Sequence, residues 1–337
     1  MKAGQAGGLA LWGAWLVRGL GLAVLLLALS FAAFRAPDRP LESLVARWAP
    51  PPSQFVELPL RGQLQLVHLR DEGPREDPLP LVLIHGTGDS LHVWDAWTRE
   101  LSKTRRVIRM DLPGFGLTGP VADGDYRIGA YVDFLWALLD QLQLRRVVLS
   151  GNSLGGEVAW MGAARQPERV AGLLLLDPSG LPFEPETLPP GFVASRFAPT
   201  AFLSRFLLPR PLVKASVEAV FGDPSKLSPA ELDRYFEITL RAGNRQALAQ
   251  RVQAFLAEVH TDLYKKAWQG LPTPVLLIWG ERDRLIPPKT AQQYQALRAP
   301  GAPPAELRLL PGVGHVPQLE APEAALAAAR PFLNSLR

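Results

Sequence analysis

The stretch VVLSGNSLGGEVAWMGAAR, residues 147–165, decides the fold. An apolar run leads into a turn of small residues around Ser153, and a helical pattern follows over 154–165. A serine held on a sharp strand-to-helix turn needs strained backbone angles that only small neighbours allow, and Gly151 and Gly155 supply that space. The pattern predicts Ser153 as a nucleophile above a sheet, facing the amino-terminal dipole of the helix. The alternative is a glycine-rich turn that matches the motif by coincidence.

Outward from this turn, short apolar runs alternate with helical patterns. A hairpin is predicted over 55–60 and 63–69, and further strands over 81–84, 106–110, 147–150, 172–176, 275–279 and 306–310. Strands that alternate with helices imply right-handed crossovers and a parallel sheet. The fold class is therefore α/β.

The alternation stops between residues 181 and 271. Helical segments are predicted there instead, and Ser228 followed by Glu231 is a capping-box signature for one of them. We interpret 181–271 as a helical cap, inserted between the two parts of a sheet domain at 54–180 and 272–337. Eight of the 14 phenylalanines lie in this insertion. The candidates for an apolar substrate pocket are Phe197, Phe202, Phe206 and Phe221, although the same residues would serve equally to pack the cap on the sheet domain.

A serine hydroxyl needs a base, and the chain has five histidines. His315 follows the last predicted strand, which places it at the carboxyl edge of the sheet, where ligands bind in open α/β folds. We therefore expect His315 to be the general base. His68 and His85 are interpreted as structural, His92 as a possible wall of the site, and His260 as a residue of the insertion.

The base in turn needs a carboxylate that orients it. Asp283 lies in the loop after the strand 275–279, and the order Ser…Asp…His is the one found in sheet-based triads. Asp283 is thus the predicted acid. Glu281, two residues away, and Asp177, at the end of the strand 172–176, are its competitors.

The oxyanion of an acyl-transfer reaction needs backbone N–H donors. The loop after the strand 81–84 is rich in glycine, and we expect the N–H groups of Thr87 and Leu154 to form this pair. Gly86, His92 and Val316 border the same loops and are further candidate substrate contacts. Glycines 114, 116 and 119 formally match a dinucleotide fingerprint, but no helix opens at them, so a turn beneath the site is the better interpretation.

Composition excludes several other classes. The net charge is +4, but the first 36 residues hold three basic and no acidic residues, which leaves the rest of the chain at +1. A nearly neutral body argues against nucleic-acid binding. The absence of cysteine excludes disulfides and thiolate zinc sites. With no metal-ligand spacing or phosphate loop, neither a metal nor a cofactor is expected.

The amino terminus carries a targeting signal. Residues 9–34 are apolar except for Arg18, long enough to cross a bilayer. We interpret 1–35 as a single-pass membrane anchor; the alternative is a signal peptide cleaved near residues 30–32, with export of the protein. The proline-rich segment 36–53 is then a spacer.

Together these loops resemble the α/β-hydrolase superfamily, in its branch with a helical cap, over roughly 54–336. The resemblance rests on five ordered motifs, at 85–88, 111–116, 151–156, 280–287 and 311–317. It implies a twisted, mostly parallel eight-stranded sheet flanked by helices, and acyl transfer through Ser153, Asp283 and His315. Related dehalogenases and epoxide hydrolases carry aspartate at the elbow, so Ser153 argues against both chemistries.

The substrate follows less directly from this resemblance. The apolar cap beside a membrane anchor favours apolar or lipid-type carboxylic esters. Three alternatives remain open: an aminopeptidase-like amidase, a carbon–carbon bond hydrolase, and a ligand-binding receptor on the same fold. The carbon–carbon reaction would require a buried arginine in the cap that faces a substrate carboxylate, with Arg196, Arg205 and Arg245 as its candidates.

Overall fold

The structure is a computed structural model that describes residues 4–258 and 262–336. Within these residues eight strands form one sheet in the order β1-β2-β4-β3-β5-β6-β7-β8. β2 runs antiparallel to its neighbours β1 and β4, and the other neighbouring pairs are parallel, which confirms the predicted sheet. The strands are β1 (Gln54–Leu60), β2 (Gln63–Glu72), β3 (Leu81–Ile84), β4 (Val107–Met110), β5 (Val147–Asn152), β6 (Val170–Leu176), β7 (Val275–Gly280) and β8 (Ala305–Leu310).

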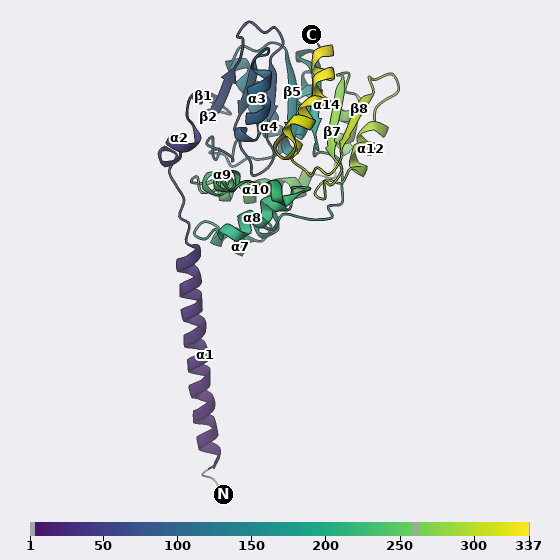
Figure 1. The fold of residues 1–337 in the computed structure, drawn as a ribbon. Helices are drawn as coiled ribbons and strands as arrows, with labels where there is room; N and C mark the ends of the chain where they lie inside the picture. Colours follow the sequence, from purple (N-terminus) through teal and green to yellow (C-terminus); the bar gives the residue numbers. More distant parts are fainter. Residues whose placement is uncertain (1–3, 259–261, 337) are drawn as a thin grey trace.

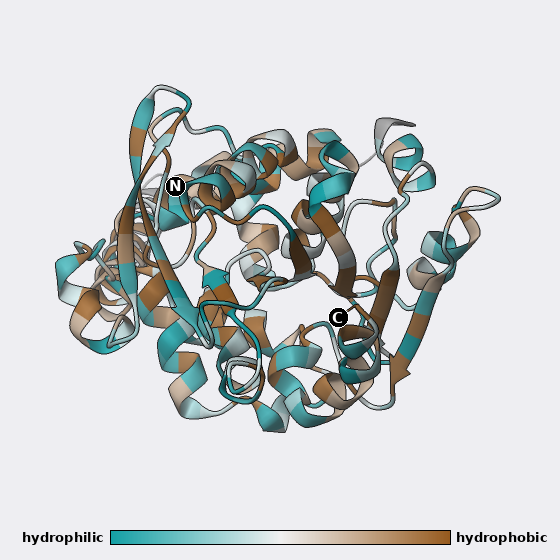
Figure 2. Ribbon diagram, turned by 90° about the horizontal axis from the view of Figure 1, so that it is seen from above, coloured by the Kyte–Doolittle hydropathy of each residue, from teal (hydrophilic) through white to brown (hydrophobic). Residues whose placement is uncertain are grey.

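The central strands are buried on both faces, as β6 shows. Its leucines alternate: Leu173 and Leu175 pack into one core cluster, and Leu174 and Leu176 into the other. Side chains along a strand point to opposite faces, so an unbroken apolar run needs cover on both sides. Each fully buried leucine contributes about 1.5–3 kcal/mol to folding. Figure 2 shows these hydrophobic strands between the surrounding helices.

Helices provide that cover. One core cluster contains apolar side chains of α4 and α5, and the other contains those of α3 and α14. The helices of this part of the chain are η1 (Leu91–Trp94), α3 (Asp95–Leu101), α4 (Ile128–Gln141), α5 (Leu154–Arg165), η2 (Pro167–Arg169), α12 (Lys289–Ala296), α13 (Pro317–Glu320) and α14 (Pro322–Ser335). The sheet is thus the middle of three layers.

The insertion between β6 and β7 is helical. It comprises α6 (Pro190–Ser195), α7 (Ala198–Leu203), α8 (Arg210–Glu218), η3 (Pro224–Lys226), α9 (Pro229–Thr239), α10 (Asn244–Glu258) and α11 (Asp262–Gln269). The predicted capping box opens α9, where Ser228 and Glu231 bond reciprocally. α11 packs instead with the sheet layer, because Trp268 is fully buried against Trp160 of α5. His260 lies outside the described residues.

A long helix, α1 (Gly4–Phe34), extends away from the body on the side of the cap (Figure 1). Its stretch Trp12–Phe34 is long and apolar enough to cross a membrane, and none of it is buried within the protein. The segment 36–53, predicted as a spacer, instead lies on the body. It contains α2 (Glu42–Trp48), and the Trp48 indole N–H donates to Glu237 of α9 at 2.8 Å.

The sheet and the cap together position one set of loops. β3, β5, β6, β7 and β8 are parallel, so the loops that follow them emerge at the same edge of the sheet. These loops and the cap helices line a common cavity.

Candidate active site

The turn after β5 holds Ser153 in a strained conformation with φ at +53°. The geometry depends on glycine at two neighbouring positions. A Cβ atom at Gly151 would lie 2.2 Å from the backbone of Gly155, and a Cβ atom at Gly155 would lie 2.2 Å from the carbonyl oxygen of Ile84. Only glycine fits such close approaches. The strained turn presents the Ser153 side chain to the cavity.

His315 lies in the loop between β8 and α13 and lines the same cavity as Ser153. Its Nδ1 is 2.7 Å from the Oδ2 atom of Asp283, and both side chains are buried. Its other ring nitrogen, Nε2, is buried and has no hydrogen-bond partner among the described residues, Ser153 included. Hydrogen bonds of this kind are often long in unliganded sites and tighten with substrate. Nε2 therefore has no partner among the described residues, and the residue that carries it borders the cavity.

Both carboxylate oxygens of Asp283 are engaged in hydrogen bonds. Its Oδ1 atom accepts the backbone N–H groups of Leu285 and Ile286 at 2.8 and 2.9 Å, while Oδ2 faces the ring of His315. These bonds fix the carboxylate and hold the imidazole in one orientation. The competitor Glu281 is exposed on the same loop and does not line the cavity.

Asp177, the other competitor, lies beside Asp283. Burial raises the pKa of the Asp177 carboxyl well above its usual range, and the negative charge of Asp283 raises it further. Its Oδ1 atom accepts the backbone N–H of Gly280 at 2.9 Å. Ligand atoms of Asp177, Asp283 and His315 lie within 4.8 Å of one another, a donor set that also suits a cation. A cation there would have to ionise Asp177 and break the contact between Asp283 and His315, so the arrangement fits a hydrogen-bonded pair of Asp283 and His315 better.

The loop after β3 brings Gly86 and Thr87 to the cavity wall. His85 supports this loop: its Nδ1 is 2.7 Å from the carbonyl oxygen of Gly86, and its Nε2 accepts the backbone N–H of Leu112 at 2.9 Å. Both ring nitrogens are thus engaged, as expected for a structural histidine. Leu154 is the first residue of α5, so its N–H has no acceptor within the helix.

Asn152 is a site residue that sequence reasoning missed. Its side-chain amide donates to the carbonyl oxygens of Leu176 and His315 at 3.1 and 2.9 Å, and it also lines the cavity. The amide therefore ties the elbow to the loop of the base. Its place directly before Ser153 was the only signal in the sequence.

Glu320 of α13 is a second residue that was missed. Its carboxylate accepts the backbone N–H groups of Gly222 and Gly314 at 2.9 and 2.8 Å. The backbone N–H of His315 donates in turn to the carbonyl of Val220 at 2.8 Å. The loop of the base is thus bonded to the cap, a contact between segments about a hundred residues apart that no local pattern indicates.

The cavity has a volume of about 460 Å³, within the usual range for ligand pockets. Its aromatic walls are Phe183, Phe192 and Phe255. Many of the remaining walls are apolar side chains, including Leu188, Leu208, Leu212, Val213, Val217, Val220, Leu248, Val252, Leu256, Leu285, Ile286 and Val316. The predicted contacts Gly86 and Val316 are therefore at the cavity.

The four phenylalanines predicted to line the pocket do not line it. Phe197, Phe202 and Phe206 are exposed, because the segment around α7 turns other residues, such as Ala201 and Ser204, towards the cavity. Phe221 is buried behind the wall, packed with Val316. The phenylalanines that do line the cavity were not singled out, since the irregular insertion has no periodicity that shows which way each side chain faces.

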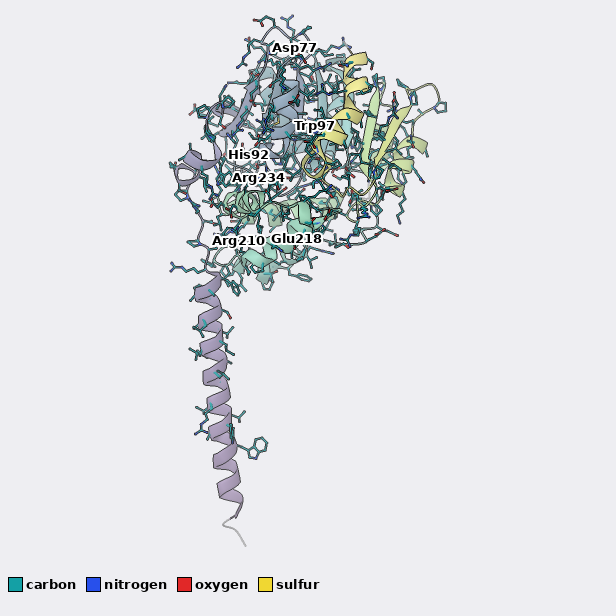
Figure 3. All side chains as sticks on the ribbon, viewed as in Figure 1. Asp77, His92, Trp97, Arg210, Glu218 and Arg234 are labelled. Atoms are coloured by element: carbon teal, nitrogen blue, oxygen red, sulfur yellow. The ribbon has the colours of Figure 1, made fainter. Side chains whose placement is uncertain are left out.

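His92 also lies away from the cavity, between the sheet domain and the cap (Figure 3). Its Nε2 is 2.7 Å from the carbonyl oxygen of Trp48, and its Nδ1 is 3.0 Å from the hydroxyl of Ser90. Burial lowers the pKa of His92 to about 3, so the ring is neutral at neutral pH. His92 therefore holds α2 on the body.

Two buried arginines line the cavity, and both guanidinium groups already have partners. Arg245 donates to the carbonyl of Ala36 at 2.8 Å and pairs with Asp38. Arg251 pairs with Glu258 at 3.2 Å. A buried cation with a carboxylate partner has little charge left for a ligand. The cavity thus suits a mainly apolar ligand.

Comparisons with known proteins agree with this geometry. The family model described as alpha/beta hydrolase fold matches residues 80–322. A 2-hydroxymuconate semialdehyde hydrolase of Pseudomonas sp. (strain CF600) is 32% identical over 72% of this chain and 82% of its own length. The dihydrolipoyllysine-residue acetyltransferase component of the acetoin cleaving system of Pseudomonas putida is also 32% identical, over 74% of this chain, which spans only 61% of that protein.

A solved structure also aligns over most of the chain. The crystal structure of a membrane phospholipase A has a TM-score of 0.70 and 24% identity, and the alignment covers 97% of this chain and 98% of that one. This likeness shows the fold, while the match to the family model extends over more than half of the sequence. The chain therefore belongs to the α/β-hydrolase fold family and is a hydrolase of that fold.

Proposed function

We propose that this protein is a serine hydrolase that cleaves carboxylic esters with apolar or lipid-type acyl groups through an acyl-enzyme intermediate. One observation carries the proposal: Ser153, on its strained turn, and His315, whose Nε2 has no partner among the described residues, line the same mainly apolar cavity. A nucleophile, a base and an acyl-binding wall are the parts that such a reaction needs.

The proposed mechanism assigns each group one role. The Oγ atom of Ser153 attacks the carbonyl carbon of the ester while Nε2 of His315 takes its proton. Asp283 keeps the proton of the ring on Nδ1 and stabilises the imidazolium. The N–H groups of Thr87 and Leu154 bind the oxyanion. His315 then protonates the leaving alcohol, and water releases the acid from Ser153 by the same steps in reverse order.

The apolar substrate class rests on the walls of the cavity and on α1. Burial of an acyl chain against aromatic and aliphatic walls is favourable by about 0.8 kcal/mol for each CH₂ group. We also propose that α1 anchors the chain in a membrane, which would bring the site close to lipid esters. The membrane phospholipase A named above agrees with this substrate class.

Carbon–carbon bond hydrolysis is the second candidate, favoured by the similarity to 2-hydroxymuconate semialdehyde hydrolase. Dienone-type acids carry a carboxylate, which needs a cation in the pocket. Of the candidates, Arg205 is exposed and does not line the cavity, Arg245 lines it but is paired with Asp38, and Arg196 lines it from an exposed position. The mainly apolar walls and the paired guanidinium of Arg245 favour the ester, and Arg196 is the cation left for an acid.

A series of p-nitrophenyl esters tests the substrate class on the full-length chain in detergent. We expect kcat/KM to rise about fourfold for each added CH₂ group until the cavity is filled. Val213→Trp, which fills part of the cavity, should shift the optimum to shorter chains, whereas Leu309→Trp on the exposed edge strand β8 should not.

The same panel should include aminoacyl anilides and a dienone-type acid. Turnover of either of these without ester hydrolysis would overturn the ester assignment in favour of the amidase or the carbon–carbon hydrolase. Absence of turnover on every substrate by the folded chain would favour a ligand-binding receptor.

A further inference from the structure

We propose that an exposed apolar surface of the cap docks into the interface of the lipid bilayer that α1 spans. The surface consists of Phe197, Phe202, Leu203 and Phe206, and we call it the cap patch. The inference rests on the proposed membrane anchor but not on the proposed reaction. Its consequence is that the cap, rather than the anchor alone, holds the protein against the membrane.

The exposure of the cap patch is unusual for this protein. Its side chains are 60%, 58%, 49% and 46% exposed, in sequence order, and the rings of Phe202 and Phe206 contact each other edge to face. Among the described residues beyond α1, all exposed phenylalanines belong to the patch. Single exposed apolar residues are normal, whereas a contiguous group of large ones marks a site of interaction.

Contacts with the end of α1 fix the depth of the cap patch. The backbone N–H of Leu208 donates to the carbonyl of Phe34 at 3.1 Å, and that of Ala36 donates to the carbonyl of Phe206 at 2.9 Å. The 23-residue stretch Trp12–Phe34, apolar apart from Arg18 and Ser30, spans about 34 Å as a helix, close to the thickness of a bilayer core. The patch therefore lies where the hydrocarbon meets the headgroups.

The charges around the cap patch fit the headgroups of anionic lipids. The segment 187–217 contains no acidic residue and four basic ones, Arg196, Arg205, Arg210 and Lys214. Arg210 and Lys214 are paired with Asp233 and Glu218, whereas Arg196 and Arg205 are exposed and have no ion-pair partner among the described residues. Phenylalanine and leucine beside arginine are typical of surfaces that lie in the membrane interface, where basic side chains are attracted to anionic lipids.

The cap patch also lies over the cavity. The same segment that exposes the patch lines the cavity with Ala194, Ser195, Thr200, Ala201 and Ser204. In Figure 3, Arg210 and Glu218 mark the end of the body next to α1, and Asp77 marks the opposite end. When the patch is docked, the short helices α6 and α7 thus lie between the bilayer and the cavity. A partner protein or a second copy would also bury the patch, but the contact with Phe34 favours lipid.

Site-directed spin labelling tests this inference well, because the chain contains no cysteine. Phe202→Cys and Phe197→Cys would each be labelled in the full-length chain, in vesicles of phosphatidylethanolamine and phosphatidylglycerol. Leu22→Cys in α1 serves as the bilayer control, and Glu76→Cys, beside Asp77, as the aqueous control. Collision rates with oxygen and with a water-soluble nickel chelate then report the depth of each label.

The quantity compared is the ratio of the oxygen collision rate to the nickel collision rate. We expect this ratio to be at least threefold higher for both patch labels than for the label at position 76. Aqueous values at the patch together with bilayer values at position 22 would overturn the docking but leave the anchor in place. Aqueous values at position 22 would remove the anchor and the docking together. Labels shielded from both reagents would indicate a protein partner and would also overturn the proposal. None of these outcomes depends on whether the protein hydrolyses esters.

Discussion

Ser153→Ala is expected to lower kcat for ester hydrolysis by a factor on the order of 10⁴ to 10⁶, because loss of the nucleophile of a triad leaves only substrate binding and oxyanion stabilisation. The substitution removes one oxygen atom from a side chain that faces the cavity, so the thermal unfolding temperature should stay within a few degrees of the parent value. The measurement is the steady-state rate with the best ester of the series, alongside thermal unfolding.

Ser335→Ala provides the matched control, since that serine lies at the exposed end of α14. It should retain the rate of the parent chain. A Ser153→Ala chain that is folded and turns over esters within tenfold of the parent would show that the nucleophile is another group, and the proposed mechanism would fail.

The second prediction separates the two carboxyl groups beside His315. Asp283→Asn should lower kcat about 10⁴-fold, because an amide at this position favours the wrong tautomer of the ring. Asp177→Asn should lower kcat by less than about tenfold, since burial and the charge of Asp283 raise the pKa of Asp177 and so favour the neutral form that an amide resembles. An asparagine side chain has nearly the same shape as an aspartate side chain, so both variants should fold.

The rates of these two variants on one ester decide which carboxyl group orients the base. A large loss in Asp177→Asn with a small loss in Asp283→Asn would assign the role of the acid to Asp177. Equal large losses would mean that the two carboxyl groups act as one hydrogen-bonded unit, contrary to the separate roles proposed for them.

The sheet was predictable from the sequence because its signals are local. The consecutive leucines of β6 are apolar at every position, which requires cover on both faces, and the structure provides it. The glycines around Ser153 are likewise explained by close approaches of the backbone. In both cases neighbouring residues along the chain carry the information.

The walls of the cavity were not predictable in this way. The direction of Phe197 and Phe202 depends on how the cap lies against the end of α1, where the segment after α7 meets residues about 170 positions earlier in the chain. The role of Glu320 depends in the same way on the meeting of α13 with the end of α8. Single-sequence patterns hold no information on such contacts. The sequence therefore shows which residue types the cap contains, but not which way their side chains point.

Labelling with a fluorophosphonate probe, followed by peptide mass spectrometry, tests the central claim most directly. The probe forms a covalent bond only with a serine that a base activates. The account predicts one adduct per chain, on Ser153 within the peptide 147–165, formed at a rate that Asp283→Asn strongly reduces. An adduct on a different residue, or an unmodified Ser153 in a chain that hydrolyses esters, would contradict it.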